Sequence, residues 1–259
     1  MRETQSARSL HVAGREQPYL LIRRQGRRRL TLSVEPRRGL VVLAPPRLAL
    51  AAIEAFLVAE AAWWTTRLAE LAAWEAEHPP RRFADGERLP LLGEAWTLRV
   101  SEAPGRLRAR VGGTGQSAGT PRGEAAREIA LVLPAGLAPE VRHAAAAAAL
   151  EAWYRPLARE LIAARAAHWA RALRVRPTAI GIRDTRSRWG SCSSSGRLSF
   201  SWRLVMAPPA VLDYLVVHEL CHLKQPDHSE RFWALVAGQL PDYERARRWL
   251  RRRGRELYL

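Results

Sequence analysis

The chain has 259 residues, with 42 Lys and Arg against 25 Asp and Glu and a formal net charge of +17. This length allows a sizeable core, and no 18-residue apolar stretch free of charge is present, so we expect no membrane-spanning helix and no membrane partner. Residues 1–14 lack the apolar core of a signal peptide, and two cysteines cannot build a disulfide framework. We therefore expect a cytoplasmic protein.

Short apolar runs with turn residues between them predict strands at residues 19–22, 30–34 and 40–43. Ala44-Pro45-Pro46 ends this sheet, and a helix is expected from about residue 48 to residue 77, where Pro79-Pro80 stops it.

The middle of the chain predicts further strands around a polar segment. Residues 82–100 indicate a hairpin with Asp85-Gly86 as turn residues, and residues 129–133 indicate another strand. Residues 104–124 are rich in Gly, Ser, Thr and Arg, so we expect a flexible insertion there.

The second half predicts mainly helix. An alanine run supports a long helix over residues 139–173, and a strand is expected at residues 175–182. We expect one α+β domain over residues 1–259, with a sheet-rich part at 15–135 and a helical part at 139–259.

Residues 218–222 have the sequence His-Glu-Leu-Cys-His. Its two histidines, four residues apart, and the glutamate after the first have the spacing of a hydrolytic zinc site. On a helix, His218 and His222 lie on one face a turn apart and can reach one ion. Glu219 follows the first of them, where its carboxylate can take a proton from a metal-bound water. The apolar run before His218 predicts a largely buried helix.

His228 is the candidate third ligand. Pro226 disfavours helix at the preceding residue, and Asp227 with Glu230 predicts a capping box that opens a second helix at about His228. A tight corner there can fold His228 back toward His222, giving three protein ligands and a fourth position for water.

Several motifs in the second half resemble those of the YgjP-like metallopeptidase family, relatives of the SprT-like zinc proteases. These motifs are Arg188-Trp189-Gly190-Ser191-Cys192, Ser201-Trp202-Arg203-Leu204, Tyr214, residues 218–222, Asp227-His228-Ser229, Phe232-Trp233, Pro241-Asp242-Tyr243 and Trp249-Leu250. The Arg-rich opening strand, Ala44-Pro45-Pro46 and two glycines, Gly86 and Gly93, continue the similarity into the first half. Ser201 stands where the family usually has Asn.

The resemblance implies a zincin-like core with a mainly antiparallel N-terminal sheet and an active-site helix. His218, His222 and His228 match the family's zinc ligands, and Glu219 matches its catalytic residue. We therefore expect a zinc metallopeptidase that acts on peptide or protein substrates, with Glu219 as general base.

Two other functions stay open. The same metal site could hydrolyse a nucleotide phosphoanhydride, since metal and arginines together can hold phosphates. A DNA-associated protease of the SprT-like type is the second, although no separate DNA-binding module is recognisable in the sequence.

The positive charge has two explanations. Lys224 is the only lysine and alanine is abundant, which is typical of a GC-rich genome, but such a bias does not explain the excess of bases over acids. The arginine-rich surface, including residues 245–255, either contacts nucleic acid or another polyanion or is simply solvated.

Four further residues near the motif have alternative roles. Arg188 either stabilises negative charge near the zinc or makes a structural ion pair, and Cys221 is expected to be a small core residue. Tyr214 and Tyr243 are both candidate oxyanion donors, and the sequence does not distinguish them.

Overall fold

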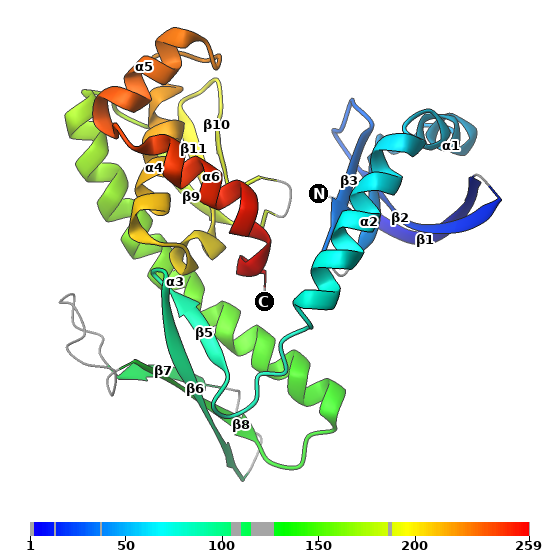
Figure 1. Ribbon diagram of the computed structural model, residues 1–259, viewed down its shortest axis with the longest axis horizontal. Helices are drawn as coiled ribbons and strands as arrows, with labels where there is room; N and C mark the ends of the chain where they lie inside the picture. The colour runs from blue at the N-terminus through cyan, green and yellow to red at the C-terminus, as the bar shows by residue number, and fades with distance from the viewer. Residues whose placement is uncertain are drawn as a thin grey trace. The chain divides into compact units, whose positions relative to one another are not determined.

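The computed structural model describes residues 3–258 except 13, 37, 105–109, 115–126 and 186–187. It has a mixed α+β architecture and divides into two compact units, Met1–Pro80 and Arg81–Leu259 (Figure 1). The domain expected over residues 1–259 includes both units, and the division at Pro80 lies within its expected sheet-rich part, residues 15–135. None of the helices in the described residues has the length and apolarity needed to cross a membrane.

The first unit consists of a four-stranded sheet and two helices. The strands are β1 (Glu3–Val12), β2 (Arg15–Arg24), β3 (Thr31–Glu35) and β4 (Gly39–Ala44), in the order β1-β2-β4-β3. The central pair, β2 and β4, is parallel, and the two outer pairs are antiparallel. Helices α1 (Leu50–Ala59) and α2 (Ala61–Glu77) complete the unit. Its core contains Tyr19, Leu21, Leu40, Val42, Ala44, Ile53, Leu57 and Trp64.

Two features of this unit differ from the sequence-based expectation. Strand β1 was not expected, because most of its side chains are polar and exposed. The helix expected over residues 48–77 is interrupted at Glu60, where α1 ends and α2 begins. The indole Nε1 of Trp64 donates to the carbonyl of Leu57 at 2.7 Å, so a side chain of α2 contacts the last turn of α1.

The second unit begins with another four-stranded sheet. Its strands are β5 (Arg88–Leu91), β6 (Glu94–Ala103), β7 (Arg110–Thr114) and β8 (Glu128–Pro134), in the order β5-β6-β8-β7. The hairpin turn is Leu92-Gly93, with φ of 52° and 78°, rather than Asp85-Gly86. Asp85 instead lies in the segment before β5, where its Oδ1 accepts a hydrogen bond from the Val100 amide at 2.8 Å.

The insertion expected over residues 104–124 is partly ordered. Arg110–Thr114 form β7, antiparallel to β8, because pairing between backbones does not require the apolar side chains from which strands are predicted. Residues 105–109 and 115–124 lie outside the described part of the chain.

Helix α3 (Pro139–Leu173) has the bounds that the sequence predicted. Figure 1 shows it as one long green ribbon that leads from the second sheet to α4 (Pro209–Cys221), against which it packs. The hydroxyl of Tyr154, in its buried middle, donates to the carbonyl of Pro90 in β5 at 2.8 Å.

A small three-stranded sheet stands beside α4. It contains β9 (Ala179–Arg183), β10 (Gly190–Cys192) and β11 (Arg197–Ser201) in the order β10-β11-β9, so β10 is an edge strand. The strand expected from residue 175 therefore begins four residues later. A 3-10 helix, η2 (Trp202–Met206), is fully buried between β11 and α4.

Two short helices, α5 (Glu230–Gln239) and α6 (Tyr243–Arg253), follow α4 and pack against it. A final 3-10 helix, η3 (Gly254–Leu257), packs beside β10: a Cβ on Gly254 would lie 3.0 Å from the Trp189 ring. The Tyr258 ring also lies 5.7 Å from that of Trp189. The end of the described chain thus supports the residue that precedes the edge strand.

Candidate metal centre

Helix α4 brings the His-Glu-Leu-Cys-His segment to the edge of the core. Val216, Val217 and Leu220 are completely buried, which fixes the helix, and His218 and Glu219 lie in its last turn. His222 is the residue that caps the helix. Cys221 is also completely buried, and burial raises the pKa of its thiol to about 11, so it is a core residue as expected.

The three histidines converge although His228 comes from a different segment. Their candidate ligand atoms all lie within 4.8 Å of one another, and Nε2 of His218 is 3.2 Å from Nε2 of His228. Tetrahedral zinc, with Zn–N distances of about 2.0–2.1 Å, separates neighbouring ligand nitrogens by about 3.4 Å. The spacing of these two nitrogens fits one shared ion.

Burial favours the neutral form that a metal requires for two of the histidines, His218 and His222. Burial, with additional repulsion from His222 and His228, lowers the pKa of His218 to about 3. Burial also lowers the pKa of His222. Nδ1 of His222 lies 3.2 Å from the carbonyl of Gln225, which can only accept, so Nδ1 carries the proton and Nε2 keeps its lone pair for the metal.

The loop that carries His228 differs from the sequence-based expectation. Helix α5 begins at Glu230, with Ser229 as N-cap, so His228 precedes the helix instead of lying in its first turn. Asp227 makes no capping box: its Oδ1 accepts hydrogen bonds from Ser229 N at 3.2 Å and from Gln225 Nε2 at 2.7 Å. The Asp227 side chain closes the corner itself, because a short carboxylate can bond to the backbone two residues on.

Two aromatic rings from α5 pack against the three histidines. The fully buried Phe232 ring lies 4.9 Å from the rings of His218 and His228 and 4.6 Å from that of His222. Trp233 stacks on His228 at 5.8 Å. Nδ1 of His218 is buried without a hydrogen-bond partner among the described atoms, so only packing holds that side of the ring.

Glu219 extends from α4 and is buried where this helix packs against the edge strand β10. Its side chain is 4% exposed, and burial raises its pKa to about 7, against the opposing effect of the Arg188 guanidinium. A Cβ placed on Gly190 would lie 2.8 Å from Cδ of Glu219 and even closer to its Oε1. Only glycine leaves room for the carboxylate there.

Gly190 lies against the candidate general base, and the sequence patterns alone do not assign it this place. It lies within a motif that was noted, and a glycine inside a strand often marks a close approach of another group. That signal could have identified it.

A family model for "YgjP-like, metallopeptidase domain" matches residues 28–253, which is most of the chain and includes the three histidines, Glu219 and Gly190. The chain belongs to the YgjP-like metallopeptidase family. A metallopeptidase domain requires a metal cofactor, and the cluster of His218, His222 and His228 is the group among the described residues that could hold one.

One solved structure is also similar to the YgjP-like chain: the crystal structure of the metallopeptidase zymogen of Pyrococcus abyssi abylysin. The two are 24% identical, with a TM-score of 0.32, and the match covers 35% of this chain and 90% of that one. No curated protein matches the chain.

The remaining expected residues of the YgjP-like chain lie around the cluster at different depths. The buried Tyr214 ring is 5.8 Å from that of His218, whereas Tyr243 stacks on Trp233 at 5.3 Å. Burial raises the pKa of Tyr214 to about 12, so its hydroxyl stays protonated and remains a donor. Arg188 is exposed and acts on Glu219 through its charge.

Proposed function

We propose that the protein is a zinc-dependent peptidase in which His218, His222 and His228 bind the metal and Glu219 is the general base. The observation that carries this proposal is the convergence of three imidazoles next to a buried carboxylate. The family assignment supports the peptidase class.

The donor set favours zinc over harder cations. Three neutral imidazoles suit zinc, whereas magnesium and calcium prefer carboxylate and carbonyl oxygens. When bound, zinc supplies a Lewis acid that polarises the scissile carbonyl and increases the acidity of a water molecule.

Glu219 is suited to moving the proton. Its pKa of about 7 makes it a better proton acceptor at neutral pH than an exposed glutamate, and the neutral acid it becomes is a donor matched to the same pH. Glu219 would therefore take a proton from the attacking water and deliver it to the leaving amine.

The edge strand β10 supports a peptide as the substrate. Among the described residues, β10 pairs only with β11, so its outer edge is available to an extended chain. A peptide added there would lie beside the Glu219 carboxylate, which contacts Gly190 of this strand.

The proposal is tested first by the metal content of wild type, His228→Ala and Glu219→Gln, measured by elemental analysis. We expect about one zinc per chain in wild type and in Glu219→Gln, and most of it lost from His228→Ala, because two imidazoles bind more weakly than three. A full complement of zinc in His228→Ala would exclude this residue as a ligand.

Turnover completes the test. Glu219→Gln is expected to lose hydrolysis by at least about 100-fold while retaining zinc, since the amide cannot accept a proton. Nucleoside triphosphates are screened with the same preparations as the protein substrates. Zinc-dependent cleavage of triphosphates alone would replace the peptidase assignment with a phosphoanhydride hydrolase.

A further inference from the structure

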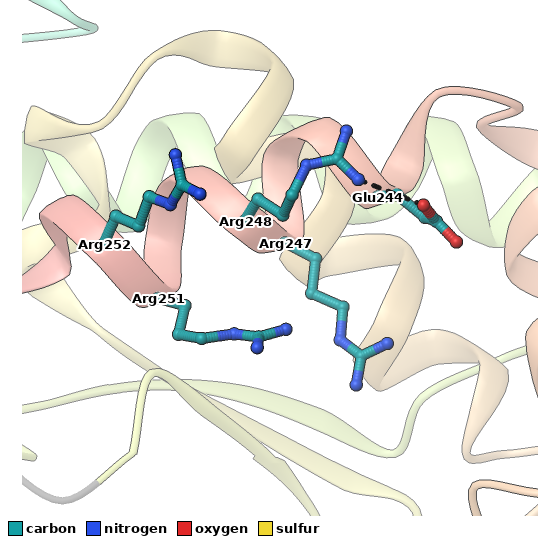
Figure 2. A pocket seen from close by; sticks show the side chains of 5 residues that line it. All are labelled: Glu244, Arg247, Arg248, Arg251 and Arg252. Carbon is teal, nitrogen blue, oxygen red and sulfur yellow. Dashed lines mark hydrogen bonds and ion pairs between the residues drawn. The ribbon is translucent and has the colours of Figure 1, made fainter.

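An arginine cluster on α6 lies beside the candidate metal centre. Figure 2 shows Arg247 and Arg251 extending from one side of the helix and Arg248 and Arg252 from the other. With Glu244 they line a hollow of about 270 Å³. The proposed peptidase mechanism makes no use of this hollow.

The cluster has unpaired positive charge. Glu244 forms an ion pair with Arg248 at 3.1 Å, which neutralises one guanidinium. Among the described residues, no carboxylate pairs with Arg247, Arg251 or Arg252, all of which are exposed. Three planar donor groups are thus available for an anion.

A short chain of ring contacts connects the cluster to the histidines. The Arg247 guanidinium lies 4.5 Å from the centre of the Trp233 ring, and that ring stacks on His228. Stacking on Trp233 holds the Arg247 side chain in place. An anion that binds there therefore costs less of this side chain's conformational entropy.

We propose that Arg247 and Arg251, which extend from the same side of α6, form an anion-binding subsite that selects peptide substrates carrying an acidic side chain near the scissile bond. The subsite rests on the proposed peptidase function. One indole ring separates Arg247 from His228, and two or three residues of extended chain cover about 7–10 Å. The acidic residue would thus be two or three positions from the bond that is cut.

The form of the hollow favours one carboxylate over a nucleic acid. A phosphate backbone needs a continuous positive track, whereas Glu244 places a negative charge in the lining of this hollow. All the residues that line the hollow belong to one helix, so it offers no continuous positive track of this kind.

The test measures binding and cleavage of short randomised peptides, labelled with a fluorophore and prepared with Asp, Asn or Lys at one fixed position. Binding is measured by fluorescence anisotropy in proteins that carry Glu219→Gln and are loaded with zinc, so that the peptides are not cleaved. The kcat/KM for cleavage is measured in the same proteins with Glu219 unchanged. We expect the Asp pool to bind about three- to tenfold more tightly than the Asn pool, as for exposed charged pairs.

The double variant Arg247→Gln/Arg251→Gln is expected to remove this preference and to leave binding of the Asn pool unchanged. The matched control is Arg159→Gln/Arg245→Gln, which also removes two exposed positive charges but none that line the hollow. A preference that survives in the double variant, or that falls equally in the control, overturns the subsite.

The outcomes separate the subsite from the peptidase proposal. A preference for Asp that depends on Arg247 and Arg251, without any cleavage by wild type, supports the subsite and rejects the peptidase. Cleavage by wild type without any preference for Asp supports the peptidase and rejects the subsite. Binding of a single-stranded oligonucleotide through these arginines, with no preference among the peptide pools, identifies a nucleic-acid surface instead and overturns the subsite.

Discussion

Glu219 owes its environment to a residue that carries no side chain. Gly190 leaves space at the edge strand for the carboxylate, and the resulting burial accounts for the raised pKa of Glu219. The two residues are far apart in the sequence and act together only because β10 packs against α4.

Gly190→Ala is therefore expected to displace the Glu219 carboxylate and reduce kcat by at least about tenfold, because an added Cβ cannot share the space at 2.8 Å from Cδ. Zinc content should not change, since the atoms nearest to a Cβ on Gly190 all belong to Glu219, which is not a candidate ligand. The control is Gly181→Ala in β9, where the nearest atom to a new Cβ is 3.7 Å away. Equal kcat in the two variants would show that the contact has no catalytic role.

The metal-free protein provides a pH test of the Glu219 environment. The pKa of Glu219 is raised from 4.5 to about 7 in the folded state, so its contribution to stability is complete below pH 4.5 and is lost as the pH rises through 7. With chelator present, the Tm of wild type should fall relative to that of Glu219→Gln between pH 4.5 and 7 and differ by a constant amount above it. Parallel Tm curves across this range would contradict the burial argument.

The candidate ligands could be predicted from the sequence because their spacing is local. His218 and His222 are one helical turn apart, and the Pro226 corner limits where His228 can go. Gly190 and Arg247 could not be assigned in this way, since their roles depend on which strand and which ring pack against them.

Helix α3 connects the elements of the second unit. It packs on α4, which carries His218 and Glu219, and its Tyr154 hydroxyl bonds to β5. The Tyr154 ring also stacks on that of Trp202 in η2 at 5.9 Å. Helix α3 thus contacts β5, η2 and α4 and holds these three elements relative to one another.

Tyr154→Phe is expected to reduce the free energy of unfolding by about 1–3 kcal/mol, because the Pro90 carbonyl loses its buried donor. Urea denaturation measures the change. Tyr19→Phe is a comparison with a weaker bond, 3.5 Å from Glu54, and should change stability less. A larger loss in Tyr19→Phe than in Tyr154→Phe would show that the Tyr154 hydrogen bond adds little.

Among the elements, those with strong local signals were the ones that could be predicted. The bounds of α3 follow from its alanine run and from Pro139 at its start. Strand β1 has mostly exposed polar side chains, and its backbone pairing with β2 is what stabilises it. The break at Glu60 has neither Pro nor Gly to mark it, and packing of Trp64 on Leu57 explains it only once the structure is known.

At the scale of the molecule, every residue proposed for the metal site and the anion subsite lies in the second unit, which has its own core. The family model nevertheless begins at residue 28 and includes much of the first unit. The first unit is thus part of the family's shared architecture without contributing a candidate ligand.

We expect residues 81–259, produced alone, to fold and bind about one zinc per chain, because the ligands and their supporting core lie within this range. Circular dichroism and elemental analysis measure this. A cooperative unfolding transition with no bound zinc would mean that the first unit is required for the metal site to form.

The contact between η3 and Trp189 has a consequence for the order of biosynthesis. Gly254 and Tyr258 pack against Trp189, next to the strand that faces Glu219, and they are synthesised after all three histidines and Glu219. All three candidate ligands therefore precede the residues that support the strand beside Glu219. A chain that stopped before Gly254 would keep the ligands and lose this support.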